Sequence, residues 1–296
     1  MRLFNKTKFN FLNKTKFTTV ISCLLIILGV VSLTSKGGPR LSIDFTGGTI
    51  IQLKFDDSME ISDLRDKLKN SSLPVSQILE FGNDTEYILR AQNSNYNSKD
   101  FITNLEQILD VPFDVRRVES VGPRIGRELR SEALQAILYA LIGILFYIWY
   151  RFDRFYALGS VAALVHDVII TIGIFSMFDF EIDLTIIAAF LTIVGYSLND
   201  TIVVFDRIRE NIGKYSRENL ESVVNLSLNE TLSRTFITSL TTLLVVFTLY
   251  LIGGEVIKLF ALALIIGVFV GTYSSIYVAS IVMIYFENKA GQKLSQ

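Results

Sequence analysis

The sequence contains very few of the residues that build disulfides, metal sites and many catalytic centres. Its 296 residues include one cysteine, Cys23, and one histidine, His166. A disulfide framework needs paired cysteines, and zinc sites use several Cys and His ligands at short spacings. A disulfide framework within the chain and a two-histidine metal site are therefore excluded. We expect no metal and no cofactor.

Motifs typical of enzymes are also missing. The sequence has no HExxH zinc-protease motif, no GxSxG nucleophile elbow and no Walker A loop for nucleotide phosphates. An intramembrane aspartyl protease would need two facing carboxylates. Asp167 and Asp200 are available, but neither lies in a sequence typical of that chemistry. We expect that the chain is not an enzyme.

An excess of charge of one sign is absent as well. The chain has 28 basic and 29 acidic side chains, with a formal net charge of −1. A nucleic-acid-binding domain is usually strongly basic, so this balance gives no support for a nucleic-acid partner.

Long apolar runs dominate what is present. Half of the residues are hydrophobic, and the mean hydropathy is positive. A membrane-spanning helix needs about 17–25 apolar residues. Six runs of this kind occur, one of them containing ILYALIGILFYIWY, which argues against the buried helices of a soluble protein. The runs are residues 17–34, 133–150, 156–178, 184–205, 235–252 and 259–286. We predict an α-helical membrane protein with six transmembrane helices.

The distribution of Lys and Arg predicts the orientation of these helices, because such residues concentrate in cytoplasmic segments. The 178–183 connection, FDFEID, has three acids and no base. No small-x-small cleavage site follows the first run, so we interpret it as a retained helix. Both termini are therefore predicted to be cytoplasmic. The basic residues used are Arg2, Lys6, Lys8, Lys14 and Lys16 before the first run, Arg151 and Arg154 after the second, and Arg207, Arg209, Lys214 and Arg217 after the fourth.

A polar insertion separates the first two helices. Alternating or apolar segments at 49–55, 75–81, 86–91 and 113–121 predict strands, with helical patterns after the first and third. The order β-α-β-β-α-β predicts a ferredoxin-like α+β domain, placed outside the cytoplasm by the helix orientation. It has no catalytic pattern, so docking is the expected role. The predicted domains are 1–34, 35–131, 132–286 and a cytoplasmic tail, 287–296.

Glycine-containing stretches lie at both ends of this insertion. Gly47 and Gly48 occur in IDFTGGT, and Gly122 and Pro123 occur in VGPRIG. Glycine accepts positive φ and proline interrupts strands, so ordinary turns explain both stretches. We also hypothesise that they are joints that let the domain move as a body.

Ionisable residues inside the apolar runs predict function. On insertion scales each costs about 2.5–3.5 kcal/mol at the helix centre. Asp200 and Arg234 both lie toward the cytoplasmic ends of their helices, so the two could meet. Burial raises the pKa of a carboxyl group, and a neighbouring arginine lowers it. A carboxylate under both influences can bind and release a proton. The alternative for Asp200 and Arg234 is a static ion pair. The alternative for His166-Asp167 is a hydrogen bond between packed helices.

Two sets of small residues predict close helix packing. Spacings of three and four place each set on one helix face. The sets are Ala188, Thr192, Gly195 and Asn199, and Ala263, Gly267, Gly271 and Ser275.

Several stretches in this order resemble the SecF family, the smaller subunits of the bacterial SecD–SecF protein-export complex. The resemblance covers nearly the whole chain, and its GYSLNDT and NETLSRT segments are the specific ones. The stretches are IDFTGGT (43–49), VGPRIGRELRSEAL (121–134), ALVHDVIITIGIF (163–175), GYSLNDTIVVFDRIREN (195–211) and NETLSRTFITSLTTL (229–243).

The resemblance implies a function. SecF-like proteins belong to the resistance-nodulation-division superfamily and are thought to use the proton-motive force across the cytoplasmic (inner) membrane, with SecD, to pull secretory polypeptides outward. The implied partners are SecD, the SecY-E-G channel, the SecA motor, the translocating polypeptide and the lipid bilayer. Protons are the implied coupling ion. The implied proton-relay residues are Asp200 and Arg234. Our own candidates for supporting residues are Asn199, Tyr196, Thr201, Thr238, His166 and Asp167.

Two other functions stay open at this point. The chain could be one half of a proton-driven exporter for small molecules, or an assembly scaffold that uses no protons. Transporters of this superfamily contain two six-helix halves, and this chain has one. A second half is therefore expected.

Overall fold

The computed structural model describes residues 7–69, 71, 73, 75–92, 98–215 and 219–294. Arg2, Lys6 and Arg217, which were used to predict orientation, lie outside these ranges. The chain forms two compact units. A helical unit comprises Met1–Arg40, Ile137–Phe180 and Thr185–Gln296, and a sheet unit comprises Leu41–Ala136 with Glu181–Leu184.

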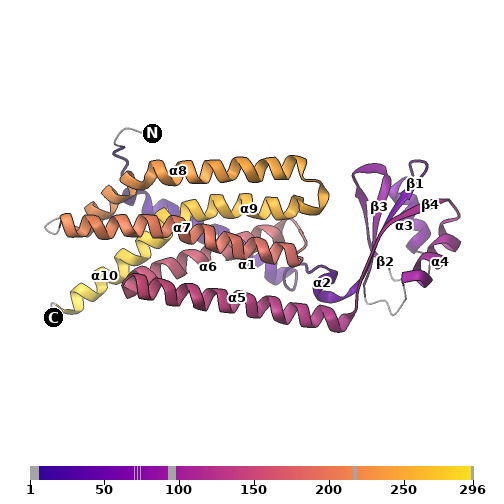
Figure 1. Ribbon diagram of the computed structural model, residues 1–296, viewed down its shortest axis with the longest axis horizontal. Helices are drawn as coiled ribbons and strands as arrows, with labels where there is room; N and C mark the ends of the chain where they lie inside the picture. The colour runs from indigo at the N-terminus through magenta and orange to yellow at the C-terminus, as the bar shows by residue number, and fades with distance from the viewer. Residues whose placement is uncertain are drawn as a thin grey trace. The chain divides into compact units, whose positions relative to one another are not determined.

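The long helices run antiparallel to one another along the chain (Figure 1). Six helices in the described part of the chain are long and apolar enough to cross a membrane, which confirms the predicted number. The last span, Val256–Ala290, includes two helices joined by a π-helical turn, Ser275–Ala279. The helices are α1 (Thr15–Ser35), α5 (Pro123–Arg151), α6 (Arg154–Met177), α7 (Leu184–Lys214), α8 (Leu220–Ile252), α9 (Glu255–Ser274) and α10 (Ser280–Leu294).

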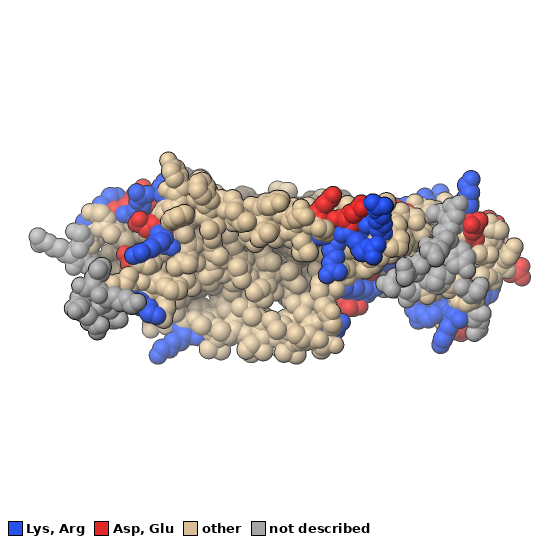
Figure 2. All heavy atoms as spheres, turned by 90° about the horizontal axis from the view of Figure 1, so that it is seen from below, with Lys and Arg blue, Asp and Glu red and all other residues tan. Residues whose placement is uncertain are grey.

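Charged side chains are nearly absent from the middle of the helical unit. Figure 2 shows a broad uncharged band with Lys, Arg, Asp and Glu gathered beyond its two ends. Large apolar side chains are exposed on α1, α5 and α8, among them Ile27, Phe146 and Val245. Exposed apolar area of this extent is typical of a surface that faces lipid or another subunit.

Glycines allow close contacts between several pairs of helices. A methyl group added at Gly29 of α1 would lie 2.8 Å from the Cα atom of Gly173 in α6. One added at Gly271 of α9 would lie 2.9 Å from Cβ of Ser197 in α7, and Gly267 meets the side chain of Ile193. The predicted close-packing face of the sixth apolar run is confirmed.

The sheet unit has the predicted β-α-β-β-α-β order. Its sheet has the strand order β2-β3-β1-β4, with neighbouring strands antiparallel. Ile51, Leu53 and Phe55 alternate along β1 and are buried against α3 and α4, as the sequence predicts. The elements are a short helix α2 (Ile43–Thr46), β1 (Gly48–Phe55), α3 (Ile61–Lys69), β2 (Val75–Phe81), β3 (Asn83–Gln92), α4 (Ser98–Leu109) and β4 (Phe113–Val121).

The two glycine stretches at the ends of the insertion lie together. Gly48 and Val121 are paired residues of β1 and β4. Gly47 has φ +76° and Gly48 has φ +145°, which side chains rarely adopt. A methyl group on Gly47 would lie 2.8 Å from Cα of Pro123, where α5 begins. The two predicted joints therefore pack directly against each other. Their mobility stays a prediction.

Candidate functional site

Asp200 is a buried carboxylate on α7. It is 2% exposed, because it lies on the side of α7 that faces α8. Among the described residues, its two oxygens accept hydrogen bonds only from Thr238 Oγ1 at 3.5 Å and Ser239 Oγ at 3.4 Å. Both distances exceed those of a strong O–H···O bond, about 2.5–3.0 Å. The carboxylate therefore has two weak donors and, among the described residues, no bonded cation.

Arg234 lies one helical turn before Thr238 on α8. Its side chain is exposed in this chain and makes no hydrogen bond or ion pair with the described residues. Arg234 therefore lies on the same stretch of α8 as Thr238 and Ser239, which contact Asp200, but no hydrogen bond or ion pair joins the side chains of Arg234 and Asp200. An arginine in an apolar span rarely faces lipid, so a further partner for the guanidinium is expected outside this chain.

The supporting residues of the GYSLNDT segment point in different directions. Asn199 is exposed, whereas Tyr196 has a buried hydroxyl oxygen without a hydrogen-bond partner. Thr201 is buried and donates to the carbonyl of Ser197 in its own helix, at 3.0 Å. Thr238 also donates to its own helix, at the carbonyl of Thr235. Of Asn199, Tyr196, Thr201 and Thr238, only Thr238, which lies on α8, forms a hydrogen bond with Asp200 in the described part of the chain.

A second buried carboxylate, Asp167 on α6, has a different environment. It is 1% exposed, accepts hydrogen bonds from two serine hydroxyls and shares a third hydrogen bond with His166. Oδ1 contacts His166 Nδ1 at 2.9 Å, and Oδ2 accepts from Ser197 Oγ at 2.6 Å and Ser274 Oγ at 2.8 Å. Asp167 thus joins α6 to α7 and α9 by short bonds, unlike Asp200.

Three consecutive residues of α9 connect the two carboxylates. Thr272 bonds to Ser239, which contacts Asp200, and Ser274 bonds to Asp167. Between them, Tyr273 stacks on the ring of His166 and bonds to Ser22 of α1. The π-helical turn begins directly after Ser274, and such turns frequently occur at functional sites.

Sequence reasoning assigned none of these hydroxyl residues to a site. Serine and threonine are common in membrane helices, where they bond to their own backbone, so type alone is a weak signal. A stronger signal is the position of Thr272 and Ser274 in the sequence. Both follow Gly271 closely and therefore lie beside the predicted packing face.

Comparisons with known proteins identify the family. A family model described as "Protein export membrane protein SecD/SecF, C-terminal" matches residues 101–289, and the "SecD/SecF GG Motif" matches residues 31–59. The chain is 44% identical over 287 residues to "Protein translocase subunit SecF" of Desulfurispirillum indicum, covering 93% of this chain and 91% of that protein. The chain belongs to the SecF family.

Further relatives support this membership. The SecF protein of Calditerrivibrio nitroreducens is 46% identical over 284 residues, which are 93% of each chain. The crystal structure of SecDF from Thermus thermophilus, described as a translocon-associated membrane protein, matches with a TM-score of 0.86 and 40% identity. That match covers 95% of this chain and 39% of the SecDF chain, so this SecF-family chain spans about two-fifths of it.

The small-residue stripe of α7 lies on the surface of this SecF-family chain. Ala188, Thr192, Gly195 and Asn199 are all exposed, and no other atom lies within 4 Å of a methyl group added at Gly195. The stripe was predicted to contact another helix. Within the described chain no helix covers it, so that contact remains a prediction about a partner.

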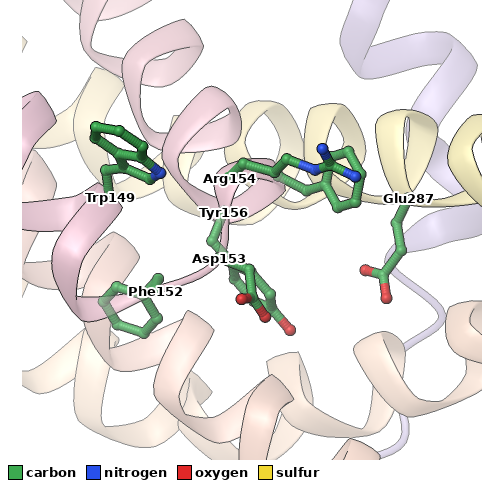
Figure 3. Close-up of a pocket in the computed structure, with 7 residues that line it drawn as sticks. Trp149, Phe152, Asp153, Arg154, Tyr156 and Glu287 are labelled. Carbon is green, nitrogen blue, oxygen red and sulfur yellow. The ribbon is translucent and has the colours of Figure 1, made fainter.

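A separate pocket of about 460 Å³ lies at the helix ends. Glu287 comes from α10, and the other lining residues come from the end of α5, the connection and the start of α6 (Figure 3). Glu287 Oε2 is buried without a hydrogen-bond partner. The pocket is several turns along α6 from Asp167. Its lining residues are Trp149, Phe152, Asp153, Arg154, Phe155, Tyr156 and Glu287.

Proposed function

We propose that this SecF-family chain uses the proton-motive force, together with a SecD partner, to promote the translocation of secretory polypeptides across the cytoplasmic membrane. Asp200 binds and releases the coupling proton, and Arg234 responds to its charge. Thr238, next to both, is the supporting residue that the geometry favours, and Asn199, Tyr196 and Thr201 act indirectly.

The observation that carries this proposal is the weak hydrogen bonding of Asp200. An ionised carboxylate inside a membrane is costly unless donors or a cation surround it. Asp167 has three short bonds, whereas Asp200 has two contacts of 3.4 and 3.5 Å. Asp200 therefore needs either a proton or the approach of a cation, and a change between these two states can move α8 relative to α7.

The surface of α7 and α8 supports a second membrane subunit. The exposed stripe on α7 provides small residues for close helix contact, and Arg234 on α8 is also exposed. The matched SecDF chain is more than twice the length of this one. We infer that a SecD half covers this surface and completes the environment of Arg234.

The sheet unit supports an external docking role. Its strand order and antiparallel pairing favour the ferredoxin-like split βαβ arrangement. The basic helix ends Arg151 and Arg209 favour cytoplasmic termini, which place the sheet unit outside the membrane. There it contacts the polypeptide as it leaves the SecY-E-G channel, after the SecA motor has acted.

The Asp200→Asn substitution tests the proposal. It keeps the shape and removes the titratable group. We expect a protein that accumulates and co-purifies with SecD normally, while translocation driven by the proton-motive force, measured in inverted membrane vesicles, falls at least about tenfold. Asp206→Asn is the matched control on the same helix, because Asp206 forms an exposed ion pair with Arg151.

Two outcomes would contradict the proposal. Normal proton-driven translocation in the Asp200→Asn vesicles would exclude Asp200 as the coupling site. Loss of SecD association in that variant would favour the assembly scaffold instead. A loss of drug export with normal secretion would favour the exporter.

A further inference from the structure

The hydrogen bonds around His166 form a chain that ends on a carbonyl group. His166 Nδ1 contacts Asp167 Oδ1 at 2.9 Å, and His166 Nε2 contacts Ser22 Oγ at 3.0 Å. Ser22 Oγ contacts Tyr273 Oη at 2.9 Å. Tyr273 Oη donates to the carbonyl oxygen of Thr18 at 2.6 Å. All four distances are within hydrogen-bond range.

Each of these four contacts needs one hydrogen atom. The carbonyl oxygen of Thr18 can only accept, so the hydroxyl hydrogen of Tyr273 occupies that contact. The hydroxyl hydrogen of Ser22 must then lie between Ser22 and Tyr273. Ser22 has no second hydrogen to give to the imidazole, so Nε2 must carry a proton itself. The contact between Nδ1 and Asp167 requires another.

We propose that His166 and Asp167 form a proton-binding site that holds two protons in this conformation. The pair then has no net charge, as an imidazolium with a carboxylate or as a neutral imidazole with a carboxylic acid. Zero net charge also agrees with the surroundings, because His166 is 6% exposed and Asp167 is 1% exposed within a candidate membrane span.

The other groups around the pair fit this count of protons. Asp167 Oδ2 accepts from two serine hydroxyls, and Tyr273 is the other ionisable side chain that contacts the pair. Among the described residues, no Lys or Arg side chain bonds to His166 or Asp167. The second proton of the pair is therefore not replaced by a neighbouring cation.

Loss of that proton would change the attachment of α1. With Nε2 bare, Ser22 must donate to the imidazole, and its contact with Tyr273 then has two oxygens and no hydrogen. One of the contacts that join α1 to α6 and α9 has to break. Protonation of the pair thus holds α1 against the two helices that carry His166 and Tyr273.

The test uses the fact that His166 is the single histidine of this chain. The full chain, purified from membranes through a histidine-free tag with any co-purifying subunit, is labelled with ¹⁵N-histidine and studied in lipid by solid-state NMR near neutral pH. Signals absent from a His166→Asn sample identify His166. Infrared spectra of the wild type and Asp167→Asn identify a protonated Asp167 carboxyl group.

The expected result is a protonated Nε2. Protonation of both nitrogens supports the site. Protonation of Nε2 alone supports it when the carboxylic acid band of Asp167 is present, and overturns it when that band is absent. A bare Nε2 also overturns it. These spectra do not depend on export. They can overturn the His166–Asp167 site while Asp200→Asn still blocks translocation, and they can support the site when Asp200→Asn has no effect.

Tyr273→Phe tests the role of the hydroxyl chain. Without the Tyr273 hydroxyl, Ser22 is free to donate to Nε2, so a population with bare Nε2 should appear. We expect the ratio of bare to protonated Nε2 to rise about fivefold, because the substitution removes one hydrogen bond that favours the protonated form. An unchanged, fully protonated Nε2 would show that the hydroxyl chain does not fix the proton, and would overturn this part of the inference.

Discussion

At the scale of single residues, two buried carboxylates with opposite degrees of hydrogen bonding lie on neighbouring helices. Asp167 is held by His166 and two serines at short distances, and Asp200 has only two long contacts. This difference predicts different results for the removal of a donor. Removal of a donor to Asp167 should lower the free energy of unfolding. Removal of a donor to Asp200 should change proton-driven translocation.

Ser197→Ala tests the stability side of this difference. It removes the 2.6 Å donor of Asp167 and leaves Ser274 in place. We expect the free energy of unfolding to fall by about 0.5–2 kcal/mol, measured by denaturation in detergent or bilayers. The matched control is Thr241→Ala, because Thr241 is exposed and bonds only to its own helix. Equal stability of the two variants would contradict a supporting role for Ser197.

The sequence singled out these charges and did not indicate which side chains surround them. Asp167, Asp200 and Arg234 stand out because a charge in an apolar run is costly. The partners do not stand out, because which hydroxyl meets a carboxylate depends on how each helix is rotated and how far it slides. Ser22 and Tyr273 are 251 residues apart and bond to each other. No local pattern records that contact.

At the scale of elements, glycine crossings fix the distances between helices. The number and order of helices and strands could be predicted because hydrophobic periodicity is a local property. Which glycines meet could be predicted only in part. The four-residue spacings on α9 predicted a close-packing face, and the structure shows that this face meets α7. Gly29 and Gly173 lie in unremarkable apolar sequence and meet at the α1–α6 crossing.

Gly29→Val tests the α1–α6 crossing. The added side chain would overlap the backbone of Gly173, so we expect α1 to move away and the free energy of unfolding to fall by about 1–3 kcal/mol. Gly143→Val in α5 is the control, since nothing lies within 4 Å of a methyl group there. Thermal unfolding in detergent distinguishes the two. A stable Gly29→Val protein with an intact α1–α6 crosslink would contradict the crossing.

At the scale of the whole molecule, this chain has an exposed polar surface inside its apolar band. The stripe on α7 and Arg234 on α8 are accessible only because nothing in the described chain covers them. This chain matches only 39% of the longer SecDF chain, and the SecD half that we propose as a partner would cover this surface. One chain alone could not predict where its partner lies, because the partner's residues are not in the sequence.

Gly195→Val tests this surface. Gly195 has open space around it in this chain, so the fold should be unaffected. A valine in the stripe would keep a partner helix at a distance, so we expect co-purification of SecD to fall at least about fivefold. Gly143→Val again serves as the control, as an exposed glycine on another helix. Full SecD recovery with Gly195→Val would show that the partner binds elsewhere.

The pairing of Gly48 with Val121 brings together the two ends of the sheet unit. Residues directly opposite each other in an antiparallel pair have Cα atoms about 4.5–5.5 Å apart. The chain therefore departs from and returns to almost the same point. Evolution can lengthen, shorten or replace everything between those two residues while the ends that connect to α1 and α5 stay in place. A change in the size or surface of the sheet unit would therefore leave the packing of the membrane helices unaltered.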